Sequence, residues 1–151
     1  MATKNAGPSG LSRWLQRRAN SSTANRIRRK GGRSMGMDLL ILHTVGHRSG
    51  EPRETPLAWF ADGDPDNKDS WLLVASGGGG RNPDWFANVT GRPDAVAVEW
   101  HGQSPVDVTP QVLDGAEREE AWQRIAEAQP RIAKYQRKSD RVYPVVRLTR
   151  R

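Results

Sequence analysis

Hydrophobic runs separated by glycine-rich turns dominate the pattern along the chain. The run MDLLILHTV is apolar almost throughout, which is typical of a strand buried on both faces, whereas AVAVEW alternates as a half-buried strand does. Six segments carry such strand patterns: residues 37–45, 53–61, 71–76, 95–100, 105–113 and 142–148. The pattern therefore predicts about six strands, the fourth and fifth of which form a hairpin.

Helical patterns occupy the N-terminal region and two later parts of the chain. Leu11, Trp14 and Leu15 recur at helical spacing, and the glycines from Gly31 onward are expected to end this first helix. Asn82 before Pro83 and the acidic stretch after Asp114 mark later helix starts. Two or three later helices are predicted, over about residues 83–91 and 114–128 and, as a shorter third one after Pro130, to about residue 138. Together with the strands they indicate an α+β fold.

Charge divides the 151 residues into two basic ends and an acidic middle. The net charge is +9 over residues 1–35, −9 over residues 36–130 and +7 over residues 131–151. A basic end attracts nucleic acid, anionic lipid or a polyanionic ligand, and charge alone does not choose among them. The acidic middle, which lacks aromatic residues interleaved with Lys and Arg, argues against a nucleic-acid partner.

Composition excludes several classes of site. Cysteine is absent, so neither disulfides nor thiolate metal sites are available. His43 and His101 have no companion at metal-ligand spacing, so no metal is expected. No apolar run approaches the roughly 20 residues that span a bilayer, and no signal-peptide pattern opens the chain, which predicts a cytoplasmic protein.

Two turns carry the candidate chemistry. The first, GHRSGEPR at residues 46–53, places arginines and a histidine where glycines allow close backbone approach, and guanidinium groups suit phosphate and carboxylate. The second, from Ser76 through four glycines to Gly80, leads into a helix start, where unpaired amides bind anions. Either turn alone is also consistent with a solvated hairpin tip or a flexible hinge.

Taken together, these two motifs resemble the deazaflavin-dependent nitroreductase family of actinobacteria. The likeness lies in TVGHRSGEPRETPL at residues 44–57 and in VASGG followed by NPDWFAN at residues 82–88, and it extends over roughly residues 37–148. The resemblance implies a split β-barrel related to flavin-mononucleotide enzymes, over residues 36–151, preceded by a basic tail and helix over residues 1–35. It also implies coenzyme F420, a deazaflavin with a phospholactyl oligoglutamate tail.

The resemblance further implies which residues hold the coenzyme. The phosphate and tail would contact His47, Arg48, Ser49, Gly50 and Arg53. The deazaflavin ring would lie against Pro56, Leu57, Ala58, Val74, Ala75, Ser76, Gly77 and Gly78, with Trp85 and Asn88 closing one side. Here the family's usual cation at the first basic position of the turn is His47, and Gly77 replaces a common lysine.

The implied activity is hydride transfer from the reduced coenzyme to an electrophile, such as a quinone, a conjugated enone or lactone, or a nitro compound. Ser76 and Tyr135 are the candidate catalytic residues, each as a hydroxyl donor to a developing oxyanion, and either Tyr135 or solvent would supply the proton. Two alternatives stay open: a non-catalytic carrier of deazaflavin or lipid, and a reductase dependent on flavin mononucleotide. The basic N-terminal helix suggests peripheral contact with anionic membrane, and the oligomeric state is not predicted.

Overall fold

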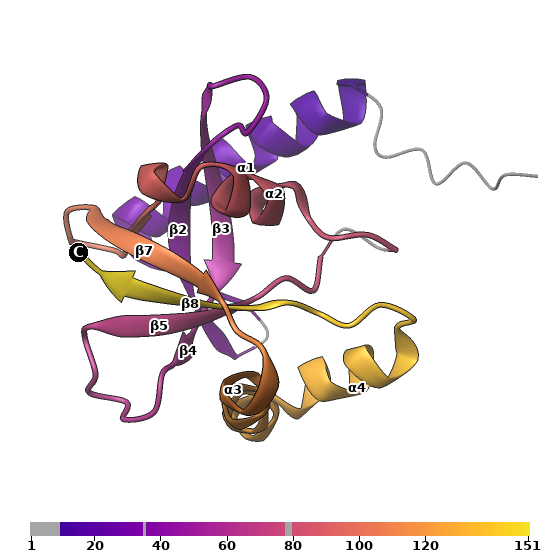
Figure 1. The fold of residues 1–151 in the computed structure, drawn as a ribbon. Helices are drawn as coiled ribbons and strands as arrows, with labels where there is room; N and C mark the ends of the chain where they lie inside the picture. The colour runs from indigo at the N-terminus through magenta and orange to yellow at the C-terminus, as the bar shows by residue number, and fades with distance from the viewer. Residues whose placement is uncertain (1–9, 35, 78–79) are drawn as a thin grey trace, which may run out of the picture.

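An antiparallel sheet curled into an open barrel forms the body of the protein (Figure 1). The computed structural model describes residues 10–34, 36–77 and 80–151. Its strands are β1 (Arg33–Ser34), β2 (Met37–Val45), β3 (Pro52–Ala58), β4 (Phe60–Ala61), β5 (Ser70–Val74), β6 (Ala97–Glu99), β7 (Val106–Val112) and β8 (Val145–Arg150). They pair in the order β1-β2-β6-β7-β8-β5-β4, and β3 pairs with β2 outside this path.

Four α-helices surround the sheet. They are α1 (Gly10–Lys30), α2 (Asp84–Gly91), α3 (Gly115–Ala128) and α4 (Pro130–Lys138), with a short 3-10 turn at Pro93–Ala95. In Figure 1, α1 lies behind β2 and β3, α2 lies over the barrel, and α3 and α4 lie together at the opposite end. The α+β architecture expected from the sequence is therefore confirmed, including a fourth helix after Pro130.

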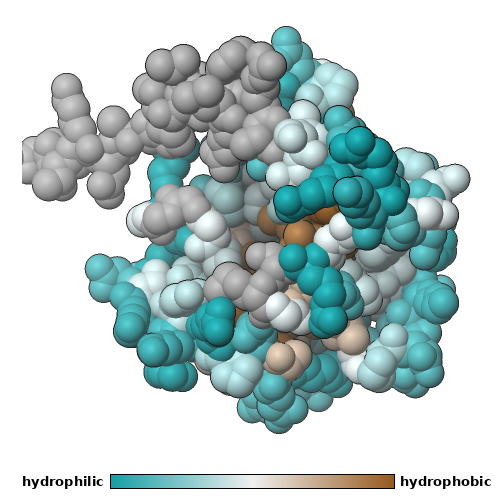
Figure 2. Space-filling view, turned by 180° about the vertical axis from the view of Figure 1, so that it is seen from behind, coloured by the Kyte–Doolittle hydropathy of each residue, from teal (hydrophilic) through white to brown (hydrophobic). Residues whose placement is uncertain are grey.

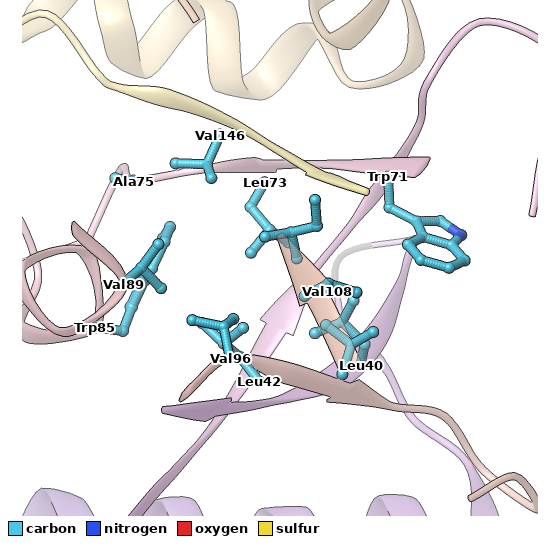
Figure 3. Close-up of a cluster of buried hydrophobic side chains, with 12 residues drawn as sticks. Leu40, Leu42, Trp71, Leu73, Ala75, Trp85, Val89, Val96, Val108 and Val146 are labelled. Carbon is cyan, nitrogen blue, oxygen red and sulfur yellow. The ribbon is translucent and has the colours of Figure 1, made fainter. Parts of the chain in front are cut away.

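The apolar strands are buried on both faces, which explains their continuous hydrophobic runs. On β5, Trp71 and Leu73 point into the barrel, where α2 adds Trp85 and Val89 (Figure 3). The alternate residues Leu72 and Val74 point outward and pack with residues of α3 and α4. A single strand thus contributes to two hydrophobic clusters, and this double burial fixes the end of β5 between the barrel and α4.

The segment expected as one strand over residues 53–61 is instead two strands with different partners. β3 pairs with β2, whereas β4 pairs with β5. Trp59, between the two strands, packs edge-on against Trp100, with their ring centroids 6.0 Å apart. Local alternation carries no information about partner exchange, so the sequence pattern runs through the break. At this break the strand pairing is interrupted, since in the described residues β3 pairs with neither β4 nor β5.

Helix α2 begins one residue later than the expected cap. Pro83 occupies the N-cap position and Asp84 is the first helical residue. The side chain of Asn82 does not cap the helix, because its oxygen accepts a hydrogen bond at 2.8 Å from the guanidinium of Arg141. Asn82 therefore binds a residue distant in sequence instead of capping α2.

Candidate functional site

The turn between β2 and β3 is a tight, hydrogen-bonded hairpin. The amide of Gly46 donates to the carbonyl of Glu51 at 2.8 Å, and the amide of Gly50 donates to the carbonyl of Gly46 at 2.9 Å. Gly50 has a φ of +72°, a conformation that side-chain-bearing residues rarely adopt. Within the described part of the chain, the exposed amides of Arg48 and Ser49 donate to no acceptor, so two turn donors face solvent.

Three guanidinium groups gather around this turn. Arg48 is exposed, Arg53 follows at the start of β3, and the guanidinium of Arg92 lies beside Gly50. Among the described residues, only the exposed Glu51 pairs with any of them, at 3.3 Å from Arg53. Because the cations outnumber their carboxylate partners, the turn is suited to bind a ligand with several negative charges.

Helix α2 holds the histidine of the turn. The side-chain oxygen of Asn88 accepts hydrogen bonds from the backbone amide of His47 at 3.0 Å and from its Nδ1 at 2.9 Å. An oxygen acceptor fixes the hydrogen of the imidazole on Nδ1. Gly91 permits this contact, since a Cβ there would lie 2.8 Å from the Cβ of His47. The turn and α2 are therefore one packed unit.

The bend after β5 is held by one arginine from the far end of the chain. The guanidinium of Arg141 donates to the carbonyls of Ala75 at 2.8 Å, Ser76 at 3.2 Å and Gly77 at 3.0 Å. Arg141 also stacks on the ring of Tyr143, 4.9 Å from its centroid. This bend is the segment that leads into α2, so α2 links it physically to the turn between β2 and β3.

A pocket of about 180 Å³ opens where the barrel wall is broken. Its walls come from the end of β3, from β4, from the end of β5 and from α4. The residues that line it are Met37, Leu57, Ala58, Phe60, Val74, Ser76, Gln129, Arg131, Ile132 and Tyr135. Seen from the back, the molecular surface is mostly hydrophilic, with its strongest hydrophobic colouring in a recess near the centre (Figure 2).

Strand β3 connects the two regions. The basic turn precedes its first residue, Pro52, and the pocket is lined by its last two residues, Leu57 and Ala58. Seven strand residues span roughly 20 Å at about 3.3 Å per residue. An elongated ligand, apolar and flat at one end and anionic at the other, matches this arrangement.

Comparison with known proteins identifies the family. Residues 14–150 match the model of the F420H(2)-dependent quinone reductase family. The F420H(2)-dependent quinone reductase of Mycobacterium tuberculosis H37Rv is 35% identical, covering 93% of this chain and 99% of that protein. The chain belongs to this family. It is an oxidoreductase whose cofactor is coenzyme F420.

Solved structures agree with this assignment and with the split barrel. An F420-H2 dependent reductase, FDR-A, is 35% identical with a TM-score of 0.60, covering 73% of this chain and 92% of that one. A domain-swapped dimer is 29% identical with a TM-score of 0.61, covering 92% of this chain and 99% of that one. A pyridoxamine 5'-phosphate oxidase-like protein of Listeria innocua is 14% identical with a TM-score of 0.50, and the match covers 74% of this chain and 82% of that one. This likeness shows the fold alone.

The residues present fit coenzyme F420. A phosphate and a chain of carboxylates need cationic forks and amide donors, which the turn between β2 and β3 presents. A flat ring needs an apolar wall with few polar groups, which the pocket supplies. In this member of the quinone reductase family, the groups at both ends of β3 therefore suit the cofactor: cations and amides at the turn, and an apolar wall at the pocket.

Several residues expected around the ring do not line the pocket. Strand alternation puts Pro56, which pairs with Ile41, on the face of β3 that α1 covers. Ala75 and Trp85 are buried in the barrel core, and Gly77 is exposed on the bend. Gly78 lies outside the described residues. Leu57, Ala58, Val74, Ser76 and Tyr135 are brought together in the pocket as a group.

The sequence analysis missed three arginines of the site. Arg92 lies beside the basic turn, Arg131 lines the pocket and Arg141 holds the bend. All three stand outside the two motifs that carry the family resemblance, and no local pattern distinguishes them from solvated surface arginines. Only the basic excess of residues 131–151 hinted that the C-terminal segment carries charged contacts.

The basic cluster of α1 is divided between the interior and the surface. Arg28 turns inward and donates to Glu99 at 2.8 Å and to Glu54, and His43 contacts Glu99 at 2.7 Å. The hydrogen bond from Arg28 lowers the pKa of Glu99 below its ordinary value, against the opposing effect of burial. Arg26, Arg29 and Lys30 remain exposed. None of the helices in the described residues has the length and hydrophobicity that a bilayer crossing requires.

Proposed function

We propose that this chain transfers hydride from reduced coenzyme F420 to a quinone or a similar conjugated electrophile in the pocket at the barrel break. One observation carries the proposal: β3 joins a cationic turn at one end to a largely apolar pocket lined by two hydroxyl groups at the other. Neither half alone suggests a redox site, but together they match a long ligand with a flat ring and an anionic tail.

The turn between β2 and β3 is the proposed binding site of the coenzyme's phosphate and tail. Arg48 and Arg53 provide charged forks, Ser49 and the turn amides provide neutral donors, and Gly50 allows close approach. His47 is held by Asn88 through its Nδ1, which leaves its other ring nitrogen available to the ligand. Arg92 extends the same cationic surface.

The pocket is the proposed site of the ring and the acceptor. Bound coenzyme supplies the hydride chemistry itself. The chain supplies apolar walls that exclude water, chiefly Leu57, Val74 and Ile132. A largely apolar pocket of this kind favours a flat, uncharged acceptor such as a quinone over a charged one.

Ser76 and Tyr135 are the proposed catalytic residues. Both line the pocket, Ser76 from the bend after β5 and Tyr135 from α4. Either hydroxyl can donate a hydrogen bond to the oxygen on which negative charge develops as a quinone accepts hydride. Tyr135 is 47% exposed, so a proton that it gives up can be replaced from solvent. Arg131 places a positive charge at the same pocket.

Steady-state oxidation of reduced coenzyme F420 by a panel of quinones, enones and nitro compounds tests the proposal. Quinone turnover is expected, and the Ser76→Ala and Tyr135→Phe variants should each lower kcat by about 10²-fold, since removal of one oxyanion donor costs on the order of 10²- to 10³-fold. Tight binding without turnover of any acceptor would make the protein a carrier. Titration with flavin mononucleotide serves as the cofactor control.

For the N-terminal helix we propose peripheral contact with an anionic membrane surface. The exposed Arg26, Arg29 and Lys30 support it, because they lie close together and have no carboxylate partner in the described residues. Each cation near an anionic bilayer contributes about 1 kcal/mol. Co-sedimentation with phosphatidylglycerol vesicles is expected for the native chain and should fall for an Arg26→Gln, Arg29→Gln, Lys30→Gln variant. Equal sedimentation of both would refute the contact.

A further inference from the structure

The bend after β5 has an unusual arrangement of backbone groups. In a strand, successive carbonyls point to alternate sides. Here the carbonyls of Ala75, Ser76 and Gly77 all reach one guanidinium, that of Arg141, at 2.8 to 3.2 Å. Three consecutive peptide groups are therefore turned the same way, and the group that turns them lies 64 to 66 residues away in the sequence.

Turning the carbonyls toward Arg141 also turns amides away from it. In a planar trans peptide the N–H and the C=O point in opposite directions. The amides of Ser76 and Gly77 therefore face away from Arg141, and in the described part of the chain neither donates to a protein acceptor. Adjacent N–H groups turned to one side form a concave donor that binds full or partial negative charge.

Arg141 closes the loop as well as orienting it. Its guanidinium donates to the side-chain oxygen of Asn82 at 2.8 Å, immediately before α2. One cation therefore ties together both ends of the glycine-rich segment. Stacking on Tyr143 holds the guanidinium itself in place. Since guanidinium groups present five N–H donors in a planar fork, no other side chain can meet these acceptors at once.

We propose that Arg141 is a positioning residue for the reaction, and that it orients the Ser76 and Gly77 amides as donors to a carbonyl or oxyanion oxygen of the bound redox ring or its acceptor. The inference rests on the proposed function for the identity of the ligand. Arg141 lies outside both sequence motifs, and in this proposal it sets the geometry of the bend that carries Ser76. In this role Arg141 acts through the backbone carbonyls that it binds.

The test uses Arg141→Lys, Arg141→Ala and a matched control, Arg118→Met. Arg118 is also partly buried, also donates to a backbone carbonyl, that of Tyr143 at 2.8 Å, and also stacks on an aromatic ring, that of Trp122. Its loss removes comparable structural contacts, including one to the backbone of Tyr143, but no hydrogen bond to the carbonyls of the bend. All variants are compared for thermal stability, for coenzyme F420 affinity by fluorescence, and for kcat and KM with a quinone.

Arg141→Lys keeps the charge but loses the fork, so kcat is expected to fall about tenfold or more with a smaller change in KM, while Arg118→Met leaves both unchanged. Millimolar guanidinium, but not ammonium at equal ionic strength, should restore part of the activity of Arg141→Ala. In nitrogen-proton NMR spectra, coenzyme F420 should shift the amide signals of Ser76 and Gly77 in the native chain and much less in Arg141→Lys.

Kinetics and binding of Arg141→Lys that match those of Arg118→Met, together with unchanged amide shifts, would overturn the inference. The NMR measurement separates it from the proposed function. Should the native chain reduce no quinone, yet show amide shifts on coenzyme binding that Arg141→Lys loses, the acceptor assignment fails and the role of Arg141 stands.

Discussion

Arg28 on α1 and the arginines at the turn between β2 and β3 show how differently the same side chain is used in this molecule. Arg28 has two carboxylate partners, Glu54 and Glu99, and Glu99 is only 11% exposed. Arg48, at the turn, has no carboxylate within ion-pair distance in the described residues. Arg28 is neutralised within the fold, whereas at the turn only Arg53 pairs with a carboxylate, that of the exposed Glu51, and Arg48 keeps its charge toward solvent.

The difference teaches that a cluster of basic residues is not by itself a binding site. A cation that is paired and partly desolvated has no net charge left to offer a ligand, and it is costly to disturb. A cation left unpaired in the fold contributes little to stability, because a surface charge interacts weakly across water. Stability and ligand binding should therefore respond separately to mutations in the two groups.

The largest expected effect is on coenzyme binding. Replacing both Arg48 and Arg53 with Ala should weaken the affinity for coenzyme F420 on the order of 100-fold, because each removes charge-assisted hydrogen bonds to the anionic tail. The melting temperature should change little. Fluorescence titration measures the affinity, and Arg137→Ala, an exposed arginine of α4, is the control. An unchanged affinity would remove the basic turn from the site.

A stability loss is expected from the other group. Arg28→Met leaves Glu99 and Glu54 without their cation in a partly buried site, which should cost about 2 kcal/mol. For a protein of this size that corresponds to a melting temperature lower by roughly 4–8 °C. Coenzyme affinity should stay within about twofold. Arg29→Met, its exposed neighbour, should have almost no effect on melting. A loss no larger than that control would show that Ala24 and Ile27 dock α1 without the ion pairs.

Acid should remove part of the same stabilisation. Since the folded state depresses the pKa of Glu99, chiefly through the hydrogen bond from Arg28, the ionised carboxylate stabilises the fold above the ordinary Glu range near about 4.3. This contribution is lost as pH falls through the depressed pKa. Melting curves of the native chain and Glu99→Gln should therefore differ at about pH 7 and converge as the pH falls below the ordinary Glu range. A constant difference across that range contradicts the assignment.

The smallest expected effect concerns the packing of α2 on the turn. In Gly91→Ala the new Cβ meets the Cβ of His47 at 2.8 Å, so the turn must shift by a few tenths of an ångström. Coenzyme affinity should fall about threefold even though alanine favours the helix. Thr90→Ala, at the neighbouring exposed position of α2, is the control for changes within the helix. Equal affinities of the two variants would show that the turn is independent of α2.

Much of the architecture was predictable because its determinants are local. The run from Trp71 to Val74 indicates a strand buried on both faces, and Pro130 marks the break between α3 and α4. The basic turn was also found from sequence, since its glycines and arginines lie within eight residues. The prediction of one strand over residues 53–61 was wrong, because the exchange of pairing partners at Trp59 does not change the hydrophobic alternation.

The sequence by itself determined most of the strands and helices along the chain, the cationic turn and the resemblance to F420-dependent enzymes, because these reside in neighbouring residues. Only the tertiary structure decided which cations form ion pairs within the fold and which face solvent. That depends on distant carboxylates such as Glu99, which is 71 residues from Arg28. It also placed the guanidinium of Arg141 within hydrogen-bond distance of the carbonyl of Ser76, 65 residues away. Hydrogen bonds act over about 3 Å, and the folding of the chain alone brings such partners within that reach.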